Sequence, residues 1–547
     1  MSGSVGPARF SGESGTRLAE RLGDPEGLPL LARLVALAPT NLEDPAHGRW
    51  EKPNYPVVAE ELVRVARGWG FGARIYDPLS QGEAAGLHGI ARPNVIVDLD
   101  VGAPERVLIL AHYDVVPVPV EQLPRWQSPP HVLTLREDGR LYGRGSNDDL
   151  GSGVVAGLLA LRRLAREGGS PRNVRLLICC DEETGGSGGI EAIKAHDESL
   201  PESDPSRILR AEVALIPDGS PHVCAGSSGV LFLDAGFDRP VGYSAVVAYG
   251  VSLVRLHELA REWRSAYRSP DWPEHAAPEP VITGRATVTR FDLERPARGA
   301  LRPRLTRIHA ETDATNQIAQ SVTFVFEGPG EKLIELGRWL PSQVPRPFRL
   351  TPLVSSAVVV PPGALALSLV GKSYHAGYPH QALNPVPAAL ALLDETVGNA
   401  KIEEEGFVSA SFGVDLRLPP EMGLEEGRRR GLGAIEEWIA HHPIGATISA
   451  PPDRQRGGYA LAPDHPMVVK LDRIMREVFG VEGVYGEYGG TDASSLLGVR
   501  TPSGAPLPAL VFGSMDRSAH IHEAEESVDP ALLGGVVRTI CEFVRSP

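Results

Sequence analysis

Apolar residues follow two different periods along this chain, and each period predicts a different kind of element. They recur every three or four residues at 27–38 and 57–69, which predicts two amphipathic helices. Nearly continuous apolar runs begin the segments 106–118 (RVLILAHYDVVPV) and 174–183 (VRLLICCDEE), which predicts strands buried on both faces. A helix rich in small residues is expected between them, at 150–167. Strand, helix and strand in this order are typical of a layered α/β domain.

The pattern becomes irregular in the middle of the chain, from about 235 to 365. Only a helix at 252–268 and strand-like pieces near 283–292 and 321–327 are predicted there. After this region strand and helix alternate twice, which predicts a separate α+β unit.

The α/β pattern returns from about 452, with two more helices and an apolar strand. We therefore expect a catalytic domain built from 1–234 and 452–547, interrupted by an inserted domain at 235–451. The irregular stretch near 238–362 is expected to be an additional insertion within that domain.

Composition narrows the classes of partner. The net charge of -15 argues against nucleic acid, because phosphate binding needs a basic surface. Since the chain contains no run of about 18 apolar residues, we expect no membrane partner. The N-terminal segment lacks the apolar core of a secretory signal, and the four cysteines are too few for a disulfide framework, so a cytoplasmic protein is expected.

Acidic residues and histidines gather where the predicted strands end. In open α/β sheets, sites form beyond the carboxyl ends of the strands. The residues concerned are His112, Asp114, Asp148, Asp149, Asp181, Glu182, Glu183, Asp218, His520 and His522. Histidine with carboxylates, and no cysteine, suits Zn²⁺ or a similar divalent ion. Two such ions would need about five or six ligands, with one carboxylate shared.

Each of these motifs has an ordinary structural explanation when it is taken alone. His112 and Asp114 form the kind of pair that often only shares a hydrogen bond, and Asp148 is placed to cap a helix. Asp218 precedes a glycine, as in many turns. Their occurrence together, at successive strand ends, favours a metal site.

The order of these motifs resembles that of the M20 metallopeptidase family, which contains carboxypeptidases, dipeptidases, aminoacylases and deacylases. The matching strings run from LAHYDVVPV through GRGSNDD, CDEETGG, IPDGS, GKSYHAGYPH, VDLRLP and YGGTDASS to HIHEAEESV, over residues 110 to 528. The resemblance implies a zinc-exopeptidase-like, three-layer α/β catalytic domain with a mixed sheet, plus an inserted α+β lid domain.

The resemblance also implies roles for individual residues. The metal ligands would be His112, Asp148, Glu183, Asp218 and His522, with Asp148 bridging two Zn²⁺ ions, for which Co²⁺ or Mn²⁺ are alternatives. Glu182 would be the general base, and Asp114 would orient His112. Two registers stay open, because Asp149 is an alternative to Asp148 and His520 to His522. Glu526, four residues after His522, favours His522.

The second domain supplies the substrate contacts that the resemblance implies. His375 would stabilise the oxyanion and Arg417 would grip the substrate carboxylate, a task that suits a planar guanidinium. Asn384, Gly490 and Thr491 would contact the substrate as well.

Three functions compete on this evidence. The first is an exopeptidase or dipeptidase, the second is an N-acyl amino-acid deacylase on the same scaffold, and the third is a catalytically inactive peptide-binding protein. The complete set of candidate ligands argues against the third. We expect a monomer with an enlarged lid, with a homodimer through the lid as the alternative.

Overall fold

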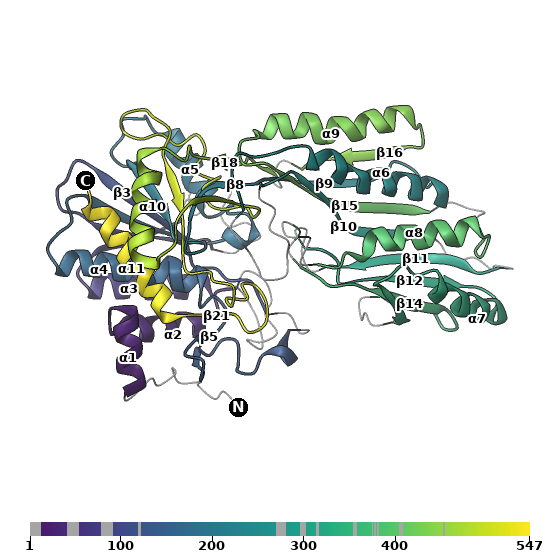
Figure 1. Ribbon diagram of the computed structural model, residues 1–547, viewed down its shortest axis with the longest axis horizontal. Helices are drawn as coiled ribbons and strands as arrows, with labels where there is room; N and C mark the ends of the chain where they lie inside the picture. The colour runs from purple at the N-terminus through teal and green to yellow at the C-terminus, as the bar shows by residue number, and fades with distance from the viewer. Residues whose placement is uncertain are drawn as a thin grey trace. The chain divides into compact units, whose positions relative to one another are not determined.

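The chain folds into two compact units, shown in the computed structural model of Figure 1. The first unit comprises Met1–Gly226, Ala460–Tyr485 and Thr491–Pro547, and the second comprises Ser227–Tyr459 and Gly486–Gly490. The residues that the structure describes are 13–40, 54–77, 91–118, 122–269, 281–295, 302–312, 317–353, 358–374, 376, 379, 382–403, 408–451 and 455–547.

A mixed sheet forms the centre of the first unit. Its strands lie in the order β1 (Gly72–Tyr76), β2 (Asn94–Leu99), β6 (Asn173–Cys179), β3 (Arg106–His112), β7 (Val213–Ile216), β20 (Ala509–Val511), β8 (Val223–Ser227) and β18 (Tyr459–Ala460), with β19 (Val484–Glu487) also paired to β8. The four strands β6, β3, β7 and β20 run parallel. Strands β3 and β6 are buried along almost their whole length, as the apolar runs predict for strands covered on both faces.

Helices flank this sheet (Figure 1). They are α1 (Glu13–Leu22), α2 (Gly27–Leu37), α3 (Tyr55–Gly68), α4 (Ala156–Arg166), α5 (Ile190–Ser199), α10 (Pro466–Phe479) and α11 (Pro530–Arg545). The last of these packs against α1, α4 and α10. Gly534 permits the close approach to α1, because an added Cβ would lie 2.0 Å from the carbonyl oxygen of Arg21.

A small second sheet of the first unit joins two distant segments. It contains β21 (Ser527–Val528), β5 (Leu141–Tyr142) and β4 (Thr134–Leu135), in that order. β5 leads into a turn of π-helix, η4 (Asp148–Val155), which continues as α4. The helix expected at 150–167 therefore begins as a wider turn, and Gly151 is needed there, since a Cβ would lie 2.2 Å from the carbonyl oxygen of Ser146.

The second unit is built on an antiparallel sheet. Its strands lie in the order β13 (Arg349–Pro352), β14 (Leu365–Val370), β12 (Ser321–Glu327), β11 (Arg304–Glu311), β10 (Arg285–Glu294), β15 (Ser409–Leu418), β9 (Gly229–Phe237) and β16 (Ala446–Ser449), with β17 (Gln455–Arg456) also paired to β9. Its helices are α6 (Tyr243–Arg261), α7 (Gly330–Trp339), α8 (Pro385–Gly398) and α9 (Leu424–His441). Because β9 pairs with β15, it belongs to this unit, whereas the boundary predicted from the sequence, at 234, falls within this strand.

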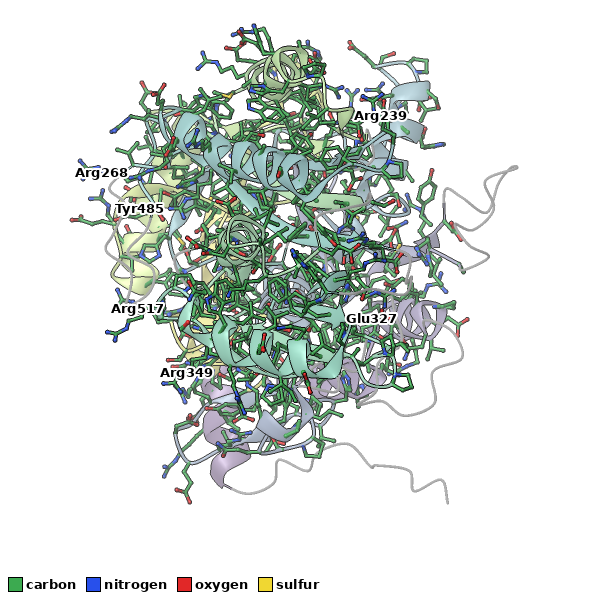
Figure 2. All side chains as sticks on the ribbon, turned by 90° about the vertical axis from the view of Figure 1, so that its right-hand side faces the viewer. Arg239, Arg268, Glu327, Arg349, Tyr485 and Arg517 are labelled. Carbon is green, nitrogen blue, oxygen red and sulfur yellow. The ribbon has the colours of Figure 1, made fainter. Side chains whose placement is uncertain are left out.

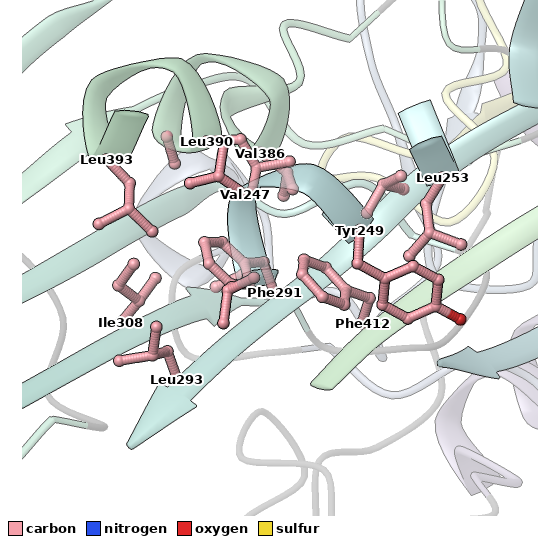
Figure 3. Packing of buried hydrophobic residues seen from close by; sticks show 14 of the residues in the cluster. Val247, Tyr249, Leu253, Phe291, Leu293, Ile308, Val386, Leu390, Leu393 and Phe412 are labelled. Atoms are coloured by element: carbon pink, nitrogen blue, oxygen red, sulfur yellow. The ribbon is translucent and has the colours of Figure 1, made fainter. Parts of the chain in front are cut away.

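The core of the second unit lies between its helices and its sheet (Figure 3). Phe291 of β10 and Phe412 of β15 stack with ring centroids 4.8 Å apart, and the Tyr249 ring of α6 meets Phe412 edge-on. Gly250 lets α6 and α8 approach closely, because an added Cβ would lie 2.6 Å from Leu390. Apolar and aromatic contacts of this kind give the unit a core of its own.

In the middle of the chain, a predicted helix is present with other bounds, and the interpretation of the region as irregular was wrong. The helix expected at 252–268 is α6, which begins at Tyr243 and ends at Arg261. The chain leaves the helix after this point because Trp263 is buried and Arg264 pairs with Thr283. The region interpreted as irregular also contains α7 and β11, which extend the regular part of the unit.

Charged side chains surround both cores. Arg239, Glu327 and Arg349 of the second unit lie at its periphery in Figure 2. Among the described residues, no helix is both long and apolar enough to cross a bilayer.

Candidate metal centre

Three parallel strands of the first unit bring the candidate ligands to one edge of its sheet. His112, the last residue of β3, is the register partner of Cys179 in β6. Glu182 and Glu183 follow that strand as a 3₁₀ turn, η5 (Glu182–Thr184). On the other side of β3, Asp218 follows β7 by two residues. The candidate ligands and Glu182 therefore lie at the carboxyl ends of neighbouring parallel strands, where open α/β sheets form their sites.

One group of ligand-type side chains surrounds the imidazole of His112. Its Nε2 lies 3.5 Å from a carboxylate oxygen of Asp149 and 3.9 Å from one of Asp218. Its Nδ1 lies 3.1 Å from the carbonyl oxygen of Asp114 and 3.3 Å from the Asp114 carboxylate. Asp114 therefore orients the ring, and Nε2 points toward the two other carboxylates.

A second group shares Asp149 with the first. Ligand atoms of Asp149, Glu183 and His522 all lie within 4.8 Å of one another. His522 Nε2 lies 2.9 Å from the Glu183 carboxylate. Asp149 is thus common to both groups, which is the arrangement that a pair of cations bridged by one carboxylate would require.

The electrostatics of these groups fit a cation. Burial lowers the pKa of the His112 imidazole, but the carboxylates of Asp149, Asp114 and Glu182 outweigh burial and raise that pKa well above its ordinary value. A centre that attracts a proton this strongly stabilises positive charge. Imidazole and carboxylate donors without thiolate are the set that Zn²⁺ and related divalent ions accept. The residues present therefore fit divalent metal ions.

Asp114 has a second task that the sequence did not reveal. Its two carboxylate oxygens accept the backbone N–H groups of Glu182, at 3.0 Å, and Glu183, at 3.1 Å. One buried carboxylate thus holds both the His112 ring and the turn that carries the two glutamates.

The turn that carries Glu182 is also held from behind. Asp181 adopts a left-handed backbone with φ 70°, which is uncommon for a residue other than glycine. The Asp181 carboxylate lies 3.1 Å from Nε of Arg92 and accepts the N–H of Gly188 at 3.1 Å. Because residue 181 immediately precedes Glu182, this buried pair fixes the direction in which the glutamates leave the strand.

Which of Asp148 and Asp149 is the shared metal ligand depends on the π-helical turn η4, in which both residues lie. Among the described side chains, that of Asp149 places its carboxylate near His112 and also near Glu183 and His522. The side chain of Asp148 lies outside the described part of the structure. The choice between the two histidines depends on a loop in which both have a left-handed backbone, and His522 is the one that meets Glu183.

The residues expected to contact substrate belong mostly to the second unit. Arg417 on β15 is buried and donates from Nε and Nη2 to the two carboxylate oxygens of Asp415, at 2.7 and 2.8 Å. Nη1 takes no part in this pair, and burial raises the pKa of Asp415 although Arg417 opposes that shift. His375 lies outside the described residues.

Asn384 caps α8: its Oδ1 accepts the N–H of Val386 at 3.0 Å and its Nδ2 donates to the carbonyl of Val288 at 2.9 Å. Gly490 is exposed, and an added Cβ there would have no neighbour within 4 Å among the described residues. Thr491 is buried, and its backbone carbonyl accepts the N–H of Ser494 at 3.0 Å. The described geometry therefore gives Asn384 a structural task and leaves the substrate roles of these three residues as predictions.

Sequence reasoning missed several buried polar residues that hold candidate site residues in place. Arg92 was assigned no role although it pairs with Asp181, which was only one acid of a trio, and Asp415 was assigned no role although it pairs with Arg417. No local signal marks most of them, because their partners are distant in the sequence. Only Asp415 stands close to its partner, in the DLR string that contains Arg417.

Known proteins share both the fold and the sequence of this chain. Its residues 108–546 match the model of peptidase family M20/M25/M40. The chain is 34% identical over 453 residues to the cysteinylglycine-S-conjugate dipeptidase of Corynebacterium striatum, an alignment that covers 81% of each protein. It is 26% identical over 218 residues to an uncharacterized metallohydrolase of Methanocaldococcus jannaschii, where the match covers 38% of this chain and only 48% of that protein.

Among solved structures, an M20 family metallo-carboxypeptidase from Sulfolobus solfataricus is similar with a TM-score of 0.54, covering 95% of this chain and 98% of that one. Its sequence identity of 14% makes this a likeness of fold. The family match over most of the chain agrees with the donor set at the edge of the sheet. The chain therefore belongs to peptidase family M20/M25/M40, and it is a hydrolase of the metallopeptidase type.

Proposed function

We propose that this chain is a two-metal dipeptidase that cleaves small peptides with a free C-terminal carboxylate. The observation that carries the proposal is the pair of ligand groups that share Asp149, with Glu182 adjacent in sequence to Glu183. The relative from Corynebacterium striatum supports a dipeptide substrate, because it aligns over 81% of both proteins.

We propose that the centre holds two Zn²⁺ ions, with Co²⁺ or Mn²⁺ as alternatives. His112 and Asp218 would hold one ion, Glu183 and His522 the other, and an aspartate of the 148–149 pair would serve both. When bound, the two ions would lower the pKa of a water molecule and polarise the amide carbonyl.

Glu182 is the general base of the proposed reaction. It would accept a proton from the attacking water as the C–O bond forms, and would then deliver that proton to the leaving nitrogen as the amide C–N bond breaks. Its placement supports this role, since Asp114 holds its backbone N–H and its carboxylate is near enough to His112 to raise the pKa of that ring.

The second unit supplies the substrate contacts in this proposal. Arg417 would bind the substrate carboxylate through the guanidinium edge that Asp415 does not use, which suits the bidentate geometry of a carboxylate. His375 would stabilise the oxyanion, as a preorganised donor does. Asn384, Gly490 and Thr491 would complete the contacts.

Kinetics of Glu182→Gln test the proposed base. We expect kcat to fall by about 10²- to 10⁴-fold, because the amide cannot accept the proton, while Zn²⁺ content stays at two equivalents. Glu198→Gln, an exposed change on α5, is the matched control and should leave kcat unchanged. A Glu182→Gln enzyme as fast as wild type would contradict the proposed mechanism.

The substrate class is tested with the same wild-type protein on dipeptides, N-acyl amino acids and C-terminally amidated dipeptides. Dipeptides should give the highest kcat/KM. A preference for N-acyl amino acids would replace the dipeptidase by a deacylase on the same centre, and binding of dipeptides without turnover would indicate an inactive peptide-binding protein.

Separate substitutions decide which aspartate is shared. The position of Asp149 predicts that Asp149→Asn weakens the binding of both Zn²⁺ equivalents by about 10- to 100-fold or more, because both groups lose a ligand. Asp148→Asn is the matched variant, because it removes the alternative carboxylate of the pair. Measured by titration against a chelator, the reverse result would make Asp148 the shared ligand.

A further inference from the structure

The loop that carries His522 has an uncommon backbone. His520, His522 and Glu525 all have positive φ angles, of 51°, 62° and 70°. Residues other than glycine rarely adopt this conformation, and it persists only where the surroundings enforce it. The position of the His522 ligand therefore depends on what holds this loop.

The segment from Gln122 to Arg144 supplies the contacts that hold the loop. Arg136 forms a bidentate ion pair with Glu525, and the backbone N–H of Gln127 donates to the Glu525 carboxylate at 2.7 Å. Arg125 lies 3.5 Å from Glu523. These side chains are partly or fully exposed, so water and salt weaken the interactions.

One pair differs from the others because it is fully buried. Nη1 of Arg144 donates to the Glu526 carboxylate at 2.7 Å, and their side chains are 0% and 1% exposed. Nη2 of Arg144 donates to Oε1 of Gln122 at 2.9 Å and reaches the carbonyl oxygen of His522 itself at 3.4 Å. Gln122 donates to the same carbonyl at 3.2 Å.

The same pair is connected to the other side of the centre. Arg144 lies between β5 and the turn that carries Asp149, and Gly143 donates its N–H to the carbonyl of Glu526 at 3.0 Å. A buried ion pair contributes little net stability, because desolvating both charges costs about as much as their attraction returns. Its distinctive property is a fixed geometry between the two segments that it joins.

We propose that Arg144 and Glu526 form a positioning pair that sets His522 against Glu183 and Asp149, and so determines the affinity for one of the two divalent cations. The proposal deepens the proposed function and rests on its two-metal centre. Neither residue touches the reacting atoms: both act through the backbone of the His522 loop.

The test measures Zn²⁺ affinity by competition with a chelator, beside thermal unfolding, for wild type, Glu526→Gln and Arg144→Lys. We expect one Zn²⁺ equivalent to be weakened by about 10- to 100-fold, the range found when groups that orient metal ligands are removed, and the other to be unchanged. Gln122→Ala, which removes one of the two donors to the His522 carbonyl, should give a smaller loss at the same equivalent.

A double variant separates positioning from stability. Arg144→Met with Glu526→Leu replaces two buried charges by two apolar side chains, so its unfolding temperature should recover relative to either single variant. Its Zn²⁺ affinity should stay low, because the Arg144 donor to the His522 carbonyl is still missing. Recovery of both properties together would overturn the proposal and make the pair purely structural.

A matched control uses a buried arginine at the far end of β6. Arg175 donates to both oxygens of Asp98 and to the carbonyl of Ile208. Arg175→Met should lower the unfolding temperature and leave both Zn²⁺ affinities unchanged. An equal loss of Zn²⁺ affinity in this control would also contradict the proposal.

Hydrolysis is measured on the wild type in the same preparation. If the wild type binds two Zn²⁺ ions and Glu526→Gln loses one of them, while no peptide is cleaved, then the proposed function fails and the positioning pair stands. If the wild type cleaves dipeptides and Glu526→Gln binds Zn²⁺ normally, then the positioning pair fails and the proposed function stands.

Discussion

Each unit of this chain buries an arginine–carboxylate pair, and the two pairs are built in different ways. Arg144 and Glu526 of the first unit are 382 residues apart in the sequence. Arg417 and Asp415 of the second unit are two residues apart on β15, with side chains 3% and 0% exposed. Burial is nearly the same in both, so the difference lies in what each pair connects.

A pair between distant segments fixes the backbone of both, whereas a pair within one strand fixes only the two side chains. Arg144 therefore influences a loop and, in our proposal, a metal ligand. Asp415 holds the guanidinium plane of Arg417, and in our proposal this reduces the entropy lost when the substrate carboxylate binds. In our proposals, two arginine–carboxylate pairs with the same burial therefore have different roles. One pair holds two chain segments together, and the other orients an arginine for binding a ligand.

Among variants of these buried pairs, the largest effect is expected from removing Arg417. Arg417→Met should lower kcat/KM for dipeptides by about 10²- to 10³-fold, because the substrate carboxylate loses a desolvated partner. Zn²⁺ affinity should stay unchanged, unlike in the Arg144 variants. A steady-state comparison of free and C-terminally amidated dipeptides checks the cause, since the amidated substrate should lose much less.

Its control removes the carboxylate that this substitution leaves behind. Arg417→Met combined with Asp415→Asn avoids a lone buried charge and should recover stability without recovering kcat/KM. An equal loss of activity on free and amidated substrates would erase the distinction between the two pairs.

A third buried pair joins residues whose separation in the sequence lies between those of the first two pairs. Arg92 and Asp181 are also buried, and Asp181 is the left-handed residue before Glu182. Asp181→Asn should destabilise the protein by about 3 kcal/mol, because Arg92 keeps a buried charge without its counter-charge. Asp181→Ala should cost about 1 kcal/mol more, since alanine is less tolerant than asparagine of that backbone.

Urea unfolding of the two variants measures both differences. If the alanine and asparagine variants have the same free energy of unfolding, then the left-handed backbone at position 181 does not depend on the type of side chain. If neither destabilises the protein, then the Arg92 pair does not hold the turn of Glu182.

The smallest expected effect concerns a cation that can lose its charge. Burial, together with Arg172 and Arg473, lowers the pKa of Lys470 to about 8. Between pH 8 and 10.5 the folded state therefore binds fewer protons than the unfolded state, so this group makes stability rise with pH across that window. Because Lys470 is only partly buried, solvent screening should limit the rise to about 1 kcal/mol.

Lys470→Met removes that rise, so the stability difference between variant and wild type should change by about 1 kcal/mol between pH 7 and 10.5. A buried arginine cannot lose its charge in this way, because arginine keeps its proton in proteins. A flat difference over this range would show that Lys470 is solvated well enough to keep its ordinary pKa.

The first unit was largely predictable from sequence because its signals are local. Long apolar runs marked β3 and β6, and the residues after them carried the chemistry. Parallel strands end at one edge of a sheet, so His112, Glu183 and Asp218 were expected to meet without knowledge of the register.

The second unit was less predictable because its alternation is interrupted. The register of β11 shifts between Leu305 and Arg307, and that of β10 shifts between Val288 and Arg290. A bulge moves the side chains that follow it to the other face and breaks the period-two pattern. β11 was therefore missed, and its region was interpreted as irregular.

The sequence by itself determined the family, the order of the ligand-type residues and the strand ends on which they stand, because these are encoded within short segments. Only the tertiary structure decided that Asp149 lies within reach of both ligand groups, that His522 rather than His520 meets Glu183, and that Arg144 pairs with Glu526. Those outcomes depend on a π-turn, on left-handed loop residues and on a contact between segments 382 residues apart. Local patterns carry no information about such contacts, since the packing of the whole unit brings the partners together.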